Sequence, residues 1–130
     1  MKILIIGYSL SSIELLQLNF SAPDFQVISA HSPHQTISII DTHSPDIILL
    51  DIPASPETIQ QSCKTLKEIK AYTTIPVIVL SVNSDPEFIA RVLNTGADDY
   101  ISKPISYPVL VARINTLIRR MRVYSPVSIT

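Results

Sequence analysis

The chain is poor in several residue types that particular functions require. Its 130 residues include two glycines, one cysteine and no tryptophan. Two glycines cannot form a glycine-rich phosphate loop, and the single Cys63 excludes an intramolecular disulfide and a cysteine-rich zinc site. No apolar run approaches the ~20 residues that span a bilayer. A net charge of −1 argues against a chain-wide polyanion-binding surface. We therefore expect a cytoplasmic globular protein without a membrane partner, in which DNA is contacted only through a domain outside this chain.

Five short apolar runs, rich in Ile, Val and Leu, alternate with stretches of helical periodicity. The runs span residues 2–6, 26–30, 46–51, 76–81 and 99–102. Because they lack polar alternation, they predict strands buried on both faces, as in a parallel sheet. The last helical stretch covers residues 106–121. This alternation predicts right-handed crossovers and an α/β fold, a three-layer (βα)5 doubly wound parallel sheet.

Three polar residues follow three successive predicted strands. Asp51 closes the third run, Ser81 closes the fourth, and Lys103 comes directly after the fifth. In doubly wound sheets the functional site lies at the carboxyl ends of the strands, near the topological switch point. An acid, a hydroxyl and an ammonium are therefore predicted to share one polar pocket. The first strand ends instead at Gly7 and Tyr8, which bring no acid to this edge.

Four blocks of sequence carry a resemblance to a known family. They are KILII at 2–6, PDIILLD at 45–51, PVIVLS at 76–81 and GADDYISKP at 96–104. With these blocks in this order and spacing, the chain resembles the CheY-like receiver domain of response regulators, and its last helix resembles those of the OmpR/PhoB class. The resemblance implies a flavodoxin-like sheet in the order 2-1-3-4-5. It covers residues 1–121, and residues 122–130 are expected to be a linker or tail.

The resemblance also implies roles for the polar residues. Asp51 matches the acid that accepts a phosphoryl group from a histidine kinase, and Ser81 and Lys103 match the hydroxyl and ammonium that bind that group. Positive charge is needed there because a carboxylate attacks an anionic donor. Ser81 and Tyr100 match the switch pair, and the bond between Lys103 and Pro104 is cis in typical members. Such a domain is not an enzyme beyond autocatalytic phosphoryl transfer onto Asp51.

At the metal position the chain departs from the family. Mg²⁺ prefers hard oxygen ligands. The family supplies them from an acidic pair after the first strand, from the phospho-acceptor, and from a backbone carbonyl two residues later. Gly7 and Tyr8 hold the positions of the acidic pair, which leaves Asp51 and the carbonyl of Pro53. We expect no cofactor or a weakly bound Mg²⁺, with Glu57 as the candidate substitute ligand.

A dimer face is also implied by the resemblance to the OmpR/PhoB class. That class dimerises through the fourth helix, fifth strand and fifth helix, using interlocked charge pairs. The matching positions here are Arg91, Asp98, Asp99, Val109 and Arg113. Val109 and its neighbour Pro108 stand where the class usually has an acid and a basic or polar residue. The predicted homodimer is therefore more hydrophobic and less dependent on phosphorylation.

Three functional hypotheses follow. The first is an atypical receiver (pseudo-receiver), a signalling and dimerisation module that forms the N-terminal part of a transcription regulator. It has weak or no Mg²⁺-dependent phosphorylation, and Asp51 and Lys103 form a fixed ion pair. The second is a working receiver that a histidine kinase phosphorylates on Asp51. The third is a small flavodoxin-like ligand-binding module with a phosphate-binding turn at residues 7–9.

Overall fold

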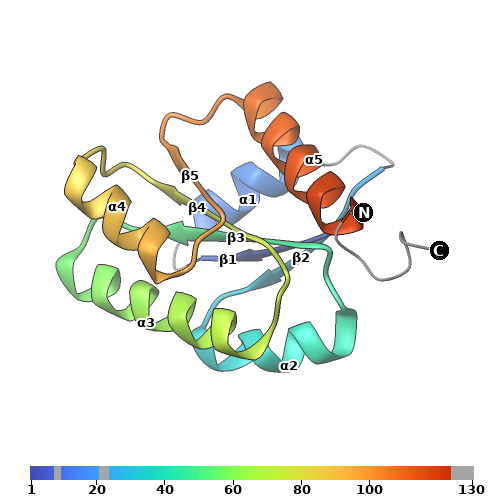
Figure 1. Cartoon of the computed structure of the whole chain (residues 1–130), viewed down its shortest axis with the longest axis horizontal. Coiled ribbons are helices and arrows are strands. Elements are labelled where there is room, and N and C mark those ends of the chain that lie inside the picture. The colour runs from blue at the N-terminus through green and yellow to red at the C-terminus, as the bar shows by residue number, and fades with distance from the viewer. Residues whose placement is uncertain (8–9, 21–23, 124–130) are drawn as a thin grey trace.

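The computed structural model describes the backbone of residues 1–7, 10–20 and 24–123, in which strands and helices alternate (Figure 1). The strands are β1 (Lys2–Ile6), β2 (Gln26–Ala30), β3 (Ile47–Ile52), β4 (Val77–Ser81) and β5 (Asp99–Ser102). The helices are α1 (Leu10–Asn19), α2 (Pro33–His43), α3 (Pro56–Tyr72), α4 (Pro86–Thr95) and α5 (Tyr107–Val123). The α5 helix therefore continues to Val123, past the predicted end at 121. Tyr8 and residues 124–130 lie outside the described residues.

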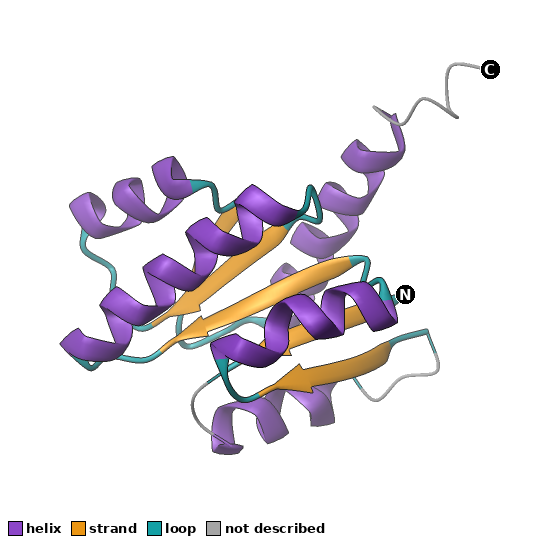
Figure 2. Ribbon diagram, turned by 90° about the horizontal axis from the view of Figure 1, so that it is seen from below, coloured by secondary structure: helices purple, strands orange, loops and turns teal. Residues whose placement is uncertain are grey.

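The strands form one parallel sheet in the order β2-β1-β3-β4-β5, which confirms the predicted topology. In Figure 2 the arrowheads of the strands accordingly point the same way. Every residue of β3 and β4 is buried, as expected of apolar runs covered on both faces. The chain passes from β1 out to β2 and then returns to β3 on the other side of β1. The topological switch point therefore lies between β1 and β3.

Helices cover both faces of the sheet, with α1 and α5 on one face and α2, α3 and α4 on the other (Figure 1). Successive residues of a strand point to opposite faces. Ile47 and Leu49 accordingly belong to the core beneath α1 and α5, and Ile48 and Leu50 to the core beneath α2, α3 and α4. No helix in the described ranges is both long and apolar enough to cross a membrane.

Two features of local chain geometry fix how the sheet presents its carboxyl edge. Gly96 ends α4 with a φ of 129°, a conformation that L side chains rarely adopt. The chain can therefore turn directly from α4 into β5. In the sheet, Ile52 is paired with Ser81, and Ser81 is paired with Ser102. The ends of β3, β4 and β5 therefore finish side by side, at one edge.

Candidate functional site

The structure brings the polar residues at the carboxyl ends of the strands to one edge of the sheet. Asp51 is 3% exposed near the end of β3, and Ser81 is 1% exposed at the end of β4. The backbone N–H of Lys103 donates to the carbonyl of Ser81 at 2.8 Å, which aligns the segment after β5 with the end of β4. Gly7 is buried directly after β1. The site therefore has one acid, one hydroxyl and one ammonium on three neighbouring strand ends.

Asp51 and Lys103 form a direct ion pair. The Nζ atom of Lys103 lies 2.5 Å from Oδ1 of Asp51, and the exposed fractions of the two side chains are 24% and 4%. Among the described residues, no other group bonds to this buried Oδ1 atom. The peptide bond between Lys103 and Pro104 is cis. Since an isolated buried carboxylate is strongly unfavourable, the ammonium neutralises a charge that the fold has removed from water.

Among the described residues, those around Asp51 do not fit a Mg²⁺ ion. Gly7 lies directly beside Asp51, because a Cβ atom at Gly7 would be 3.7 Å from the Cβ of Asp51. That same atom would lie only 3.0 Å from Cγ1 of Ile13. In the described parts of the chain, no group of three or more His, Cys, Asp or Glu side chains could hold a metal. One carboxylate whose oxygen already contacts an ammonium is a poor site for a cation that prefers several oxygen ligands.

The segment between β3 and α3 carries the remaining candidate ligands. Pro53 is half-buried directly after β3, whereas Glu57 is exposed in the first turn of α3. The carboxylate of Glu57 accepts a hydrogen bond from the Ser55 hydroxyl at 2.8 Å. Glu57 is therefore engaged locally, at a helix start where a negative charge is favourable in any case.

Tyr100 of β5 is half-buried and packs against the core beneath α2, α3 and α4. Its hydroxyl donates to the backbone carbonyl of Asn83 at 2.6 Å, and its ring packs edge-on against Phe88 of α4 with 6.2 Å between the ring centroids. Burial raises the pKa of Tyr100 above its usual 10.0, and the nearby Ser81 hydroxyl offsets part of that rise. The phenol is thus held protonated, as a hydrogen-bond donor to the loop after β4.

Asn83 is the residue of this site that the sequence analysis missed. Its N–H donates to Oγ of Ser81 at 3.1 Å, and its own Oδ1 accepts from the N–H of Asp85 at 2.9 Å. The signal was available, because Ser, Asn and Asp at every second position favour consecutive side-chain-to-backbone turns. Asn83 therefore connects the site hydroxyl to Tyr100 and to the start of α4.

Replacing Tyr100 with phenylalanine tests this connection. At neutral pH we expect a loss of roughly 1 kcal/mol in the free energy of unfolding, because the Asn83 carbonyl loses its donor. Because the pKa of Tyr100 is higher in the folded state than in the unfolded state, its contribution to stability is complete below the pKa of the unfolded state. That contribution is lost as the pH rises through the pKa of the folded state. The stability difference between the native chain and Tyr100→Phe should therefore shrink above about pH 10. Urea unfolding at neutral and alkaline pH measures it, and a constant difference would contradict the assignment.

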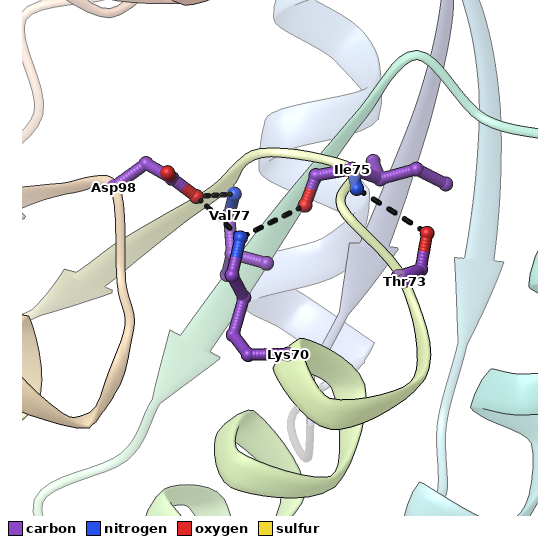
Figure 3. A network of polar contacts seen from close by, with 5 residues as sticks. All are labelled: Lys70, Thr73, Ile75, Val77 and Asp98. Carbon is purple, nitrogen blue, oxygen red and sulfur yellow. Dashed lines mark hydrogen bonds and ion pairs between the residues drawn. The ribbon is translucent and has the colours of Figure 1, made fainter.

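The residues predicted to form the dimer face are divided between two roles. Arg113 of α5 lies 3.6 Å from Asp99 of β5 within the chain, with the arginine exposed and the aspartate half-buried. Asp98 instead accepts bonds from the N–H of Val77 and the ammonium of Lys70, which lie on the α3 side (Figure 3). Arg91 is exposed on α4, and Val109 is 47% exposed on α5. The exposed surface over α4, β5 and α5 thus combines Arg91, the Asp99–Arg113 pair and an apolar side chain.

Comparison with known proteins relates this architecture to one family. Residues 3–115 match the family described as "Response regulator receiver domain". Among curated proteins, the transcriptional regulatory protein KdpE of Mycobacterium tuberculosis is 30% identical over 91% of this chain and 51% of its own length. The alkaline phosphatase synthesis transcriptional regulatory protein PhoP of Bacillus subtilis is 30% identical over 98% of this chain and 52% of its own length. The chain thus spans about half the length of these relatives.

Solved structures agree in fold. A two-component response regulator from Clostridium difficile superposes with a TM-score of 0.79 at 28% identity, over 93% of this chain and 98% of the other. The N-terminal domain of the nisin resistance regulator NsrR superposes with a TM-score of 0.76 at 32% identity, over 91% of this chain and 97% of the other. A CheY-like receiver domain protein from Methanospirillum hungatei superposes with a TM-score of 0.81 over 95% of this chain and 98% of the other. At 19% identity this similarity supports the fold alone.

Proposed function

The chain belongs to the response regulator receiver family, and from that premise we propose that it is an atypical receiver, a signalling and dimerisation module with weak or no Mg²⁺-dependent phosphorylation. Its curated relatives are transcriptional regulatory proteins of about twice the matched length. We accordingly place it as the N-terminal part of such a regulator, with DNA contacted by a domain outside this chain. The site and not the fold supports this function, because one fold hosts many functions.

One observation carries the proposal. The position beside Asp51 that would need an acid is Gly7, and the only ion-pair partner of Asp51 among the described residues is Lys103. Acyl phosphate formation needs positive charge that is free to meet the incoming phosphoryl group. Here a single ammonium shares its charge with the attacking carboxylate, and the described residues hold no group of ligands that could add the charge of a metal ion. Phosphoryl transfer onto Asp51 is therefore slow.

A specific observation also favours a second candidate, a working receiver that a histidine kinase phosphorylates on Asp51. Asp51, Ser81 and Lys103 meet at one edge of the sheet with the types and order that phosphoryl binding uses. The missing acids reduce metal binding but leave the acceptor carboxylate, the hydroxyl and the ammonium in place. The flavodoxin-like ligand module has no comparable support, since Tyr8 and Ser9 of its proposed turn lie outside the described residues.

In the atypical receiver, dimerisation through the surface over α4, β5 and α5 replaces phosphorylation as the output. Tyr100 bonds to the Asn83 carbonyl and packs against Phe88, which ties β5 to α4 within this surface. Val109 and Leu93 are 47% and 40% exposed on this side of the molecule, and apolar surface favours association without a charge switch. The proposed dimer therefore forms in the unmodified protein.

Sedimentation velocity before and after treatment with acetyl phosphate and Mg²⁺, with mass spectrometry of the same samples, tests this function. We expect one dimerisation constant in both samples and no mass gain on the protein. Val109→Asp should weaken the dimer about tenfold by placing a charge in the interface. Asn115→Asp adds the same charge on another side of α5 and is the matched control. A monomer that dimerises only after gaining a phosphoryl group on Asp51 would establish the working receiver instead.

A further inference from the structure

A small apolar pocket opens beside the site, on the face of the sheet that α1 and α5 cover. Its volume is about 310 Å³, at the lower end of the range for small-molecule sites. The wall combines two leucines of α1 with the segment that leads from β5 into α5. The lining residues are Leu15, Leu16, Lys103, Pro104, Ile105 and Tyr107. The pocket is therefore formed by helix and loop residues, and it reaches the phospho-acceptor site through one shared side chain.

Two of the described residues that line this pocket carry polar side-chain groups. Among them Lys103 contributes the only charge, and one described carboxylate oxygen, on Asp51, pairs with its ammonium. Since an ammonium has three N–H donors, this contact leaves donors for a second acceptor. Tyr107 contributes a hydroxyl that bonds to no described residue, and burial raises the pKa of this phenol, which keeps it a donor. The pocket thus presents an apolar wall and unmatched hydrogen-bond donors.

We propose that this pocket binds a small organic monocarboxylate, with its apolar body against Leu15, Leu16 and Ile105 and its carboxylate against the ammonium of Lys103. Charge complementarity selects an anion, because the described lining residues include one ammonium and no acidic side chain. Burial of an apolar body supplies the affinity, and the charge-assisted bond to Lys103 supplies the preference for an acid. The binding goes beyond the proposed function, since it needs neither phosphorylation nor a dimer.

Occupation of the pocket would act directly on the site. Lys103 is the partner of Asp51 on one side and a lining residue of the pocket on the other. A carboxylate that takes part of the ammonium's hydrogen-bonding capacity weakens its hold on Asp51. In a receiver that is not switched by phosphorylation, binding of the acid would then change the Asp51–Lys103 pair and shift the conformation of the same site.

The test uses 1-naphthoate as the probe and 1-naphthalenemethanol as its neutral counterpart. Methyl NMR spectra of the whole 130-residue chain, labelled at Leu and Ile, follow each titration. We expect saturable shifts at Leu15, Leu16 and Ile105 for both probes, with naphthoate binding more tightly. Lys103→Met should weaken naphthoate about tenfold and leave the alcohol unchanged, since only the acid uses the charge. Lys103→Arg should retain the preference for the acid.

Two further variants keep the result interpretable. Lys103→Met leaves Asp51 buried without its partner, so the double variant Asp51→Asn with Lys103→Met removes both charges and protects the fold. It should show the same loss of preference for the acid. Lys67→Met, on the exposed side of α3, removes a positive charge from the other face of the sheet and should change nothing. Absence of saturable binding, shifts confined to other methyls, or equal affinity for acid and alcohol in the native chain would overturn the proposal.

Discussion

Replacing Gly7 and Tyr8 together with aspartate is expected to give Asp51 a Mg²⁺-dependent phosphorylation on the order of a hundredfold faster than in the native chain. The added carboxylates supply oxygen ligands at a site where the described residues form no group that could hold a metal. Bound Mg²⁺ then adds positive charge beside an acceptor whose only ion-pair partner among the described residues is Lys103. Mass spectrometry after treatment with acetyl phosphate measures the rate. Calorimetry with Mg²⁺ alone measures the metal affinity separately.

Packing around Gly7 leaves little space for an acidic side chain at this position. A Cβ atom at this position would lie 3.0 Å from Cγ1 and 3.3 Å from Cδ1 of Ile13, closer than such contacts normally are. Ile13 is 1% exposed and must shift to admit the new side chain. Adding Ile13→Ala to the double variant should therefore raise the Mg²⁺ affinity further. The same change should lower the free energy of unfolding by about 2–4 kcal/mol, because it opens a cavity.

The matched control replaces Gly7 and Tyr8 with asparagine, which has the same shape as aspartate without the charge. It should bind Mg²⁺ no better than the native chain, and Asp51→Asn should abolish labelling in the aspartate variant. If the native chain gained mass as fast as the aspartate variant, the acids would be unnecessary. The proposal of an atypical receiver would then be wrong.

Replacing Asp98 with alanine should destabilise the fold by about 2 kcal/mol, more than any other change to the predicted dimer-face charges. Its Oδ2 atom accepts from the N–H of Val77 at 2.8 Å and from Nζ of Lys70 at 2.9 Å (Figure 3). Val77 is 0% exposed, so its N–H would lose its acceptor inside the fold. Lys70 also donates to the carbonyl of Ile75 at 3.3 Å, and the network therefore fixes the chain where β4 begins.

The matched control is Asp99→Ala at the next position. The partner of Asp99 is Arg113, 3.6 Å away, and the two side chains are 25% and 57% exposed. Ion pairs near the surface contribute about 0–1 kcal/mol. Urea unfolding of both variants and of Asp98→Asn separates the effects, because asparagine keeps an oxygen for Val77 but loses the charge that Lys70 uses. Equal stability of the Asp98 and Asp99 variants would show that the network contributes little.

Most of the architecture was predictable because its causes are local. Runs of Ile, Val and Leu define strands covered on both faces, and β1, β2 and β5 begin and end where the sequence predicted. The predicted end of α5 was two residues too early. Arg122 and Val123 extend the helix beyond the last apolar residues that the sequence analysis could use to recognise it. Asp51, Ser81 and Lys103 could be placed at one edge because strand ends in a parallel sheet share that edge.

The finer contacts could not be predicted because they depend on partners far apart in the chain. Lys70 and Asp98 are separated by 28 positions, and nothing in either segment indicates the other. The resemblance grouped Asp98 with Asp99, whereas the backbone directs the two carboxylates to different neighbours. The pocket beside Lys103 likewise depends on how α1 lies against the segment after β5, and no local pattern encodes that distance.

The ion pair between Lys103 and Asp51 also constrains how the sequence can diverge. With its ammonium on the buried carboxylate, the domain tolerates glycine beside Asp51 without leaving an isolated charge in the fold. A change that removes an acid at position 7 is therefore nearly neutral for stability. A change that removes Asp51 or Lys103 alone is not, because it leaves the other charge without its partner. Among descendants of this chain, positions 51 and 103 are expected to change together, and position 7 independently of both.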